Sequence, residues 1–185
     1  MAATEIAAVA FGIAYILLAI REHRGCWIAG GVSSALYAVV FFGVGLPMQS
    51  LLQLVYVALS VYGWVVWGPY ASDSQRADSL QPSAHLLAVA GIALATAFSA
   101  PLAARYALAT EPLADSLGTW ASLFATWLLA RRYIDTWTWW VVIDTGLAAL
   151  FASQGLWPTA GLYLAYAVLA IAGWRSWRHR RLQAS

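Results

Sequence analysis

An acidic residue lies inside a long apolar stretch of this chain and shares a helical face with two tryptophans. Trp137, Trp140 and Asp144 are spaced i, i+3 and i+7, which places all three side chains on one face of an α-helix. Tryptophan faces attract cations by about 0.5–2 kcal/mol and stack on planar rings. This face therefore suits a small ligand with a flat, positively charged heteroaromatic ring.

Asp144 is the residue for which an apolar setting costs most. An ionised carboxylate at the centre of a membrane helix costs about 2.5–3.5 kcal/mol, so it is expected to face a partner or a watery cavity. No arginine or lysine lies near the middle of an apolar segment to neutralise it. Contact with a substrate, a structural hydrogen bond to a neighbouring helix, and proton transfer all fit this carboxylate, and we favour substrate contact.

Two other apolar segments carry polar side chains at helical spacing. Gln53, Tyr56 and Ser60 are again at i, i+3 and i+7, and two tyrosines lie three positions apart near the C-terminus. Gln53 either contacts a ligand or hydrogen-bonds between helices, and both alternatives stay open. The predicted substrate-binding residues are Gln53, Tyr56, Ser60, Trp137, Trp140, Asp144, Tyr163 and Tyr166.

Composition places these residues in a membrane. The 185 residues are 62% hydrophobic and 10% charged, which leaves too little polar surface to cover a soluble globule. A membrane-spanning helix needs about 20 mostly apolar residues, and charged or turn residues mark off seven such segments. These segments run over about 5–20, 27–43, 47–68, 84–104, 115–130, 137–153 and 157–177. The sequence predicts one all-α membrane domain, 1–185, with seven transmembrane helices.

The chain also repeats itself at an offset of 110 residues. Trp27 matches Trp137, and Gly63-Trp64 matches Gly173-Trp174, without a gap. This offset crosses four spans, an even number, so matching segments run in the same direction through the membrane. Two similar halves around one central pocket indicate a transporter.

The span between the two copies has no partner in the repeat. We therefore expect a first three-helix repeat at 1–68, a linker helix at 84–104 and a second three-helix repeat at 115–177. This 3+1+3 arrangement of parallel repeats is the one seen in SWEET sugar transporters.

Arginines predict the orientation of the chain. With seven spans, nine of the ten basic residues fall on one side, and arginine-rich short loops stay cytoplasmic. The N-terminus is expected outside and the C-terminus inside. Four tryptophans beside these arginines at the ends of spans are expected to be interface anchors: Trp64, Trp67, Trp174 and Trp177.

Several motifs in the same order resemble those of the PnuC family of bacterial vitamin transporters. They are Gln53-x-x-Tyr56 followed by Tyr62-Gly63-Trp64, then Arg131-x-Tyr133 followed by Trp137 and Trp140, then Gly155-Leu156-Trp157. The resemblance covers nearly the whole chain and is specific, because these motifs occur together.

This resemblance implies facilitated diffusion of nicotinamide riboside into the cytoplasm, where a separate kinase traps it by phosphorylation. Thiamine or riboflavin is the alternative substrate, since relatives move these vitamins. The resemblance also implies a SWEET-like fold in the bacterial cytoplasmic (inner) membrane. One position departs from the pattern, because members that move nicotinamide riboside often have Asn where this chain has Asp144.

Other classes of protein fit the sequence less well. His23, His85 and His179 lie at or outside span ends and share no helical face, so we predict no enzyme, catalytic residue, metal or cofactor. The single Cys26 excludes an intramolecular disulfide, and the C-terminal arginines indicate contact with the lipid bilayer and not with nucleic acid. A membrane scaffold would leave the polar face around Asp144 without a purpose, and assembly into a homo-oligomer stays open.

Overall fold

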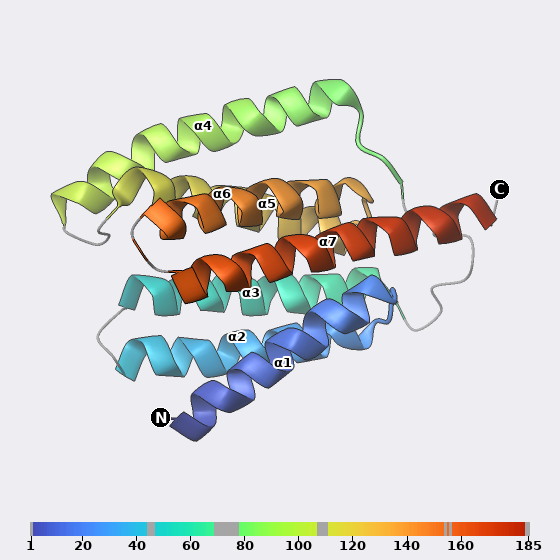
Figure 1. Cartoon of the computed structure of the whole chain (residues 1–185), viewed down its shortest axis with the longest axis horizontal. Coiled ribbons are helices and arrows are strands. Elements are labelled where there is room, and N and C mark those ends of the chain that lie inside the picture. The colour runs from blue at the N-terminus through green and yellow to red at the C-terminus, as the bar shows by residue number, and fades with distance from the viewer. Residues whose placement is uncertain are drawn as a thin grey trace. The chain divides into compact units, whose positions relative to one another are not determined.

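Figure 1 shows a computed structural model that describes residues 2–43, 47–68, 78–106, 111–153, 155 and 157–183. Over these residues the chain forms seven α-helices. They are α1 (Ala2–Ile20), α2 (Gly25–Gly43), α3 (Pro47–Val66), α4 (Pro82–Arg105), α5 (Pro112–Ala130), α6 (Asp135–Ser153) and α7 (Trp157–Gln183). The all-α prediction with seven helices is confirmed, whereas the SWEET-like arrangement stays a prediction.

Most helix ends lie within a few residues of the predicted segments. Three helices begin on a proline, α3, α4 and α5, where the missing backbone N–H costs least. The exception is the C-terminal end of α7, which continues through the arginine-rich tail to Gln183. Arginine favours the α-helix, so α7 extends beyond its apolar residues. Residues 44–46, between α2 and α3, and residues 154 and 156, between α6 and α7, lie outside the described residues.

Three helices are long and apolar enough to cross a membrane, judged by length and composition over the described residues. These stretches are Ala3–Ile20, Gly25–Gly43 and Pro82–Arg105, and Ser50–Val66 of α3 is apolar but shorter. In α4 the side chains of Leu86 and Phe98 are 73% and 79% exposed. Such large exposed apolar side chains are the surface expected to face lipid.

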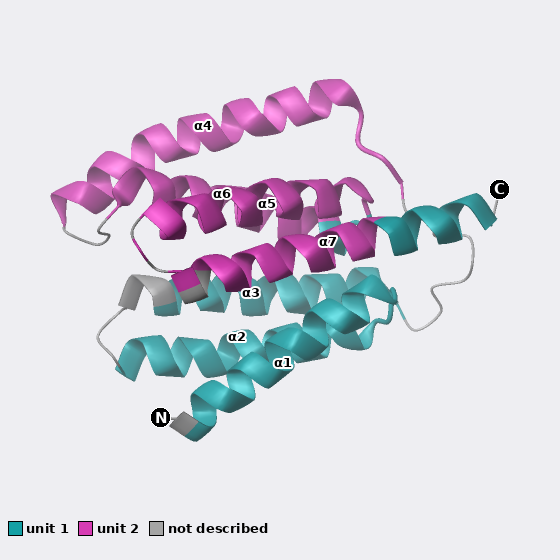
Figure 2. Ribbon diagram, in the orientation of Figure 1, with its two compact units in different colours: residues 1–77, 129–132, 175–185 teal, residues 78–128, 133–174 magenta. Residues whose placement is uncertain are grey.

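Contacts within the chain divide it into two compact units (Figure 2). Unit 1 consists of Met1–Ala77, Leu129–Arg132 and Arg175–Ser185, and unit 2 of Asp78–Leu128 and Tyr133–Trp174. The last residues of α5 and of α7 therefore belong to unit 1. The predicted division into 1–68, 84–104 and 115–177 follows the sequence repeat and not the contacts, and it stays a prediction.

Each unit has its own packing. In unit 1, α2 packs against both α1 and α3, and Ser33 of α2 donates a hydrogen bond of 2.8 Å to the Ala8 carbonyl of α1. In unit 2, α4, α5 and α6 share an apolar core built on Ile92, Ala121, Ala125 and Ile143.

The turns after α1 and after α5 have the same backbone geometry, 110 residues apart. Glu22 and Arg132 both adopt left-handed conformations, with φ of 56° and 60°, which is uncommon for residues other than glycine. The next N–H, of His23 or Tyr133, donates to the carbonyl five residues earlier at 2.9 Å in both turns. The repeat is therefore present in the backbone as well as in the sequence.

Each repeat also packs a tryptophan against a helical glycine. The Trp27 ring lies against Gly63 in unit 1, and the Trp137 ring lies against Gly173 in unit 2. A Cβ added to Gly173 would lie 2.5 Å from Cε3 of Trp137, and one added to Gly63 would overlap the Trp27 ring in the same way. Only glycine leaves room for either indole.

Trp67 and Trp177 are not the interface anchors that we expected. They are 0% and 1% exposed, and their ring centroids are 6.2 Å apart. The Trp67 indole N–H donates to the Ala130 carbonyl at 3.1 Å, and the Trp177 indole N–H donates to the Ala19 carbonyl at 3.0 Å. These carbonyls lie at the ends of α5 and α1, where backbone acceptors lack partners within the helix, so the two indoles are held inside.

Arginines surround this end of unit 1. Arg180 pairs with Glu22, with 2.8 Å between Nε and Oε1, and the Arg132 guanidinium carbon lies 4.4 Å from the centroid of the Trp67 ring. Burial lowers the pKa of Arg132, and the carboxylate of Glu22 acts in the opposite direction. Arg24 stacks 3.6 Å above the Trp64 ring. The tryptophans at this end are thus held by cations as well as by carbonyls.

Candidate substrate site

Asp144 lies in the middle of α6 and is buried. Its side chain is 5% exposed, and its carboxyl group lies close enough to Tyr163 and Tyr166 of α7 to interact electrostatically with both phenols. Unit 2 therefore brings three of the predicted site residues together. A carboxylate next to phenol groups can accept hydrogen bonds from them or attract a cationic ligand.

Aromatic rings extend this cluster along α7. The Tyr163 and Tyr166 rings meet edge to face, with centroids 5.9 Å apart. Phe151, near the end of α6, stacks on Tyr163 at 5.3 Å. These rings supply the flat, apolar faces against which a heteroaromatic ligand packs.

The two tryptophans of α6 differ in their surroundings. Trp137 is 4% exposed and lies against Gly173 of α7. Trp140 is half-buried and packs against the apolar core that contains Ile92 and Ile143. Both indoles belong to the same unit as Asp144. Their proposed contact with a ligand stays a prediction.

The three predicted residues of α3 lie in unit 1. Ser60 is 8% exposed and lies near Gly30 and Gly31 of α2, while Gln53 and Tyr56 are half-buried. Tyr56 interacts electrostatically with Tyr15 of α1. These three residues were predicted to bind the substrate, and this stays a prediction.

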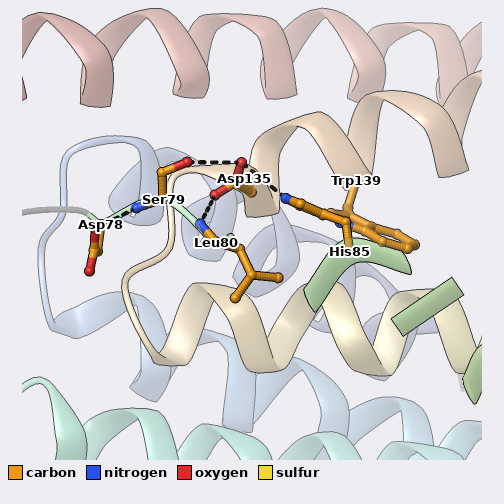
Figure 3. A network of polar contacts seen from close by, with 6 residues as sticks. All are labelled: Asp78, Ser79, Leu80, His85, Asp135 and Trp139. Atoms are coloured by element: carbon orange, nitrogen blue, oxygen red, sulfur yellow. Dashed lines mark hydrogen bonds and ion pairs between the residues drawn. The ribbon is translucent and has the colours of Figure 1, made fainter. Parts of the chain in front are cut away.

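A second polar cluster, which the sequence did not predict, surrounds the start of α6 (Figure 3). Asp135 contacts His85 of α4 and the backbone of Leu80, and Trp139 donates a hydrogen bond to His85. The signal available in the sequence was weak, because His85 and Asp135 are fifty positions apart. Among the described residues, no group of three or more His, Cys, Asp or Glu side chains could hold a metal ion.

The fold defines a class, a multi-pass helical membrane protein, and unit 2 of this one contains a buried acidic and aromatic cluster. Residues 2–179 match the family model described as nicotinamide mononucleotide transporter. The chain belongs to this family, and it is therefore a membrane transporter and not an enzyme.

Similar proteins agree with this family. The chain is 26% identical over 193 aligned residues to the nicotinamide riboside transporter PnuC of Escherichia coli (strain K12). This alignment covers 90% of this chain and 81% of the relative. The PnuC protein of Shigella flexneri matches equally well. A crystal structure of the vitamin B3 transporter PnuC has a TM-score of 0.75 at 22% identity, over 98% of this chain and 83% of the other.

Proposed function

We propose that this protein carries nicotinamide riboside into the cytoplasm by facilitated diffusion. The observation that carries the proposal is the buried Asp144 on an indole-bearing face of α6, beside Tyr163 and Tyr166, in a chain similar to transporters named for this vitamin. Nicotinamide riboside carries a planar pyridinium ring, which is the kind of ligand that a carboxylate and aromatic faces bind together.

Transport proceeds by alternating access in this proposal. The two three-helix repeats rock about a shared pocket, which Gln53, Tyr56 and Ser60 line from one side and the α6 and α7 residues line from the other. The arginine distribution supports an external N-terminus and a cytoplasmic C-terminus. Downhill movement needs only reorientation of the loaded carrier, and a separate cytoplasmic kinase keeps the free vitamin inside low by phosphorylating it.

A thermal-shift screen of the detergent-solubilised protein tests the substrate. A ligand that binds only the folded state raises the apparent melting temperature as its concentration increases. We expect nicotinamide riboside to give the largest concentration-dependent shift, with thiamine second and neutral riboflavin smallest. A larger shift with thiamine would reassign the substrate, and no shift with any of the three would count against a vitamin carrier and favour a scaffold.

Thiamine is the second candidate because of the carboxylate of Asp144. The thiazolium ring is also a planar cation, and the aminopyrimidine offers a hydrogen-bond donor to an acidic side chain. The position that is Asp144 here is often Asn in carriers of nicotinamide riboside, so the charge at this position is the feature that favours thiamine.

A further inference from the structure

The polar cluster at the start of α6 joins three separate parts of unit 2. Asp135, in the first turn of α6, accepts a hydrogen bond of 2.7 Å from the Leu80 N–H and one of 3.4 Å from the Ser79 hydroxyl. Its other contact is His85 of α4, with 3.5 Å between Oδ1 and Nε2. Figure 3 shows Asp135 between the segment before α4 and the His85 ring.

Trp139 completes this cluster from the next turn of α6. Its indole N–H donates a hydrogen bond of 3.2 Å to Nδ1 of His85, and the two rings are nearly parallel, with an interplanar angle of 15°. Trp139 also meets Phe124 of α5 edge to face at 4.9 Å. We call the group Ser79, Leu80, His85, Asp135 and Trp139 the α4–α6 clasp.

The contacts of His85 determine where its proton lies. An indole N–H only donates, so Nδ1 must be unprotonated to accept the hydrogen bond from Trp139. The proton of the neutral ring then lies on Nε2, which faces the Asp135 carboxylate. A second proton, on Nδ1, would set two donors against each other and break the bond to Trp139, while it would strengthen the pairing with Asp135.

The clasp and the candidate substrate residues lie on roughly opposite faces of α6. At about 100° per residue, Asp135 and Trp139 share one face, Trp137 and Asp144 lie on the roughly opposite face, and Trp140 lies between them on the side of the apolar core. Holding the first face to α4 therefore fixes the rotation of α6 about its axis, and with it the direction in which the Asp144 carboxylate points.

We propose that His85 and Asp135 are positioning residues for transport: while His85 is neutral, its contacts with Asp135 and Trp139 orient the substrate-facing side of α6, and a second proton on His85 breaks the Trp139 contact and so disturbs that orientation. This inference rests on the proposed function. The titratable groups around the ring are Asp135 of α6 and, beyond Ser79, Asp78, whose carboxylate instead accepts the Ser79 N–H at 2.8 Å. From α5, the described contact to the clasp is the apolar ring of Phe124.

A fluorescence titration of the detergent-solubilised protein tests the clasp without any ligand. The chain has eleven tryptophans, so the emission of Trp139 is obtained by subtracting the spectrum of Trp139→Phe from that of the wild type. We expect the emission of Trp139 to differ between about pH 8 and about pH 5, because a proton on Nδ1 of His85 removes the acceptor of the indole N–H, and we expect His85→Gln to abolish the difference. A transition that persists unchanged in His85→Gln would overturn the proposal.

Binding of nicotinamide riboside by calorimetry then tests positioning. Glutamine offers a donor and an acceptor but no titrating proton, so His85→Gln should bind almost as tightly as the wild type at about pH 7.5. The wild type should lose about threefold or more in affinity at about pH 5.5, His85→Gln should lose none, and His85→Leu should be weak at both values. His179→Gln, whose only described contact is with Gln183, is the matched control and should keep the wild-type pH dependence.

The outcomes separate this inference from the proposed function. Asp144 is a second titratable group on α6, so a loss of affinity at low pH that survives in His85→Gln assigns the effect elsewhere and overturns the inference. A wild type that binds no nicotinamide riboside at either pH counts against the proposed function. In that case the fluorescence titration still decides whether the Trp139–His85 hydrogen bond is lost when His85 gains a proton.

Discussion

At the scale of the residue, the charge of Asp144 is the most informative feature of the candidate site. The side chain is buried beside two phenols, and the described basic residues lie outside the middle of α6. A cationic ligand would supply the missing positive charge. An asparagine at position 144 would still form hydrogen bonds, but it would carry no negative charge to attract a cation.

Asp144→Asn should therefore weaken binding of nicotinamide riboside about tenfold, which corresponds to ~1.4 kcal/mol, while leaving the melting temperature almost unchanged because the two side chains have nearly the same shape. Calorimetric titration of the solubilised protein measures both affinities. Asp115→Asn, an exposed position in the first turn of α5, is the matched control. Equal dissociation constants for the wild type and Asp144→Asn would move the cation-binding role to another residue.

At the scale of the element, the helices and their ends could be predicted from hydropathy, prolines and arginines, because those signals are local. The contacts of Trp67, Trp177 and His85 could not. An indole beside arginines at the end of a span has the same sequence signature whether it faces lipid or a distant carbonyl, and Ala130 and Ala19 lie 63 and 158 positions from their donors. Asp144 was expected to face a partner or a watery cavity because a carboxylate is costly in an apolar helix, and its side chain is buried.

The tryptophan–glycine pairs lead to a prediction about helix packing. Gly63→Ala and Gly173→Ala should each destabilise the protein by about 1–3 kcal/mol, because a rigid indole must move to admit the methyl group. Thermal unfolding in detergent measures the loss, and the two variants should lose similar amounts because the pairs are related by the repeat. Gly91→Ala has open space around it in α4, so it is the control and should be neutral or stabilising. If Gly63→Ala and Gly173→Ala melt at the same temperature as Gly91→Ala, the indoles can move at little cost and the prediction is wrong.

At the scale of the whole molecule, the repeat was predicted from sequence alone, and the turns after α1 and α5 have the same backbone geometry at matching positions. The residues that would form a shared pocket were chosen by their spacing on single helices. Spacing determines which side chains share a face, but it does not determine which faces meet, because that depends on contacts among helices far apart in the sequence.

Facilitated diffusion makes a prediction for the intact carrier in liposomes. Purified protein without a kinase or an ion gradient should bring nicotinamide riboside to the same concentration inside and outside, because nothing drives it further. Kinase and ATP enclosed in the liposomes should then raise total uptake while the free vitamin stays at or below its external level. Radiolabelled uptake measures both, and protein-free liposomes are the control. Free vitamin above the external concentration without kinase would require a coupled energy source.

The hydrogen bonds of Trp67 and Trp177, each made to a helix of the other copy, suggest how a chain with two copies evolves. Each indole donates to the helix end that the other copy contributes, Ala130 for Trp67 and Ala19 for Trp177. A single segment of this kind could make both bonds by pairing with an identical molecule, as self-complementary dimers do. Gene duplication joined by α4 would convert that dimer into one polypeptide, after which each half is free to change on its own. Asp144 shows such a difference, because the matching position in the first copy is Ser34.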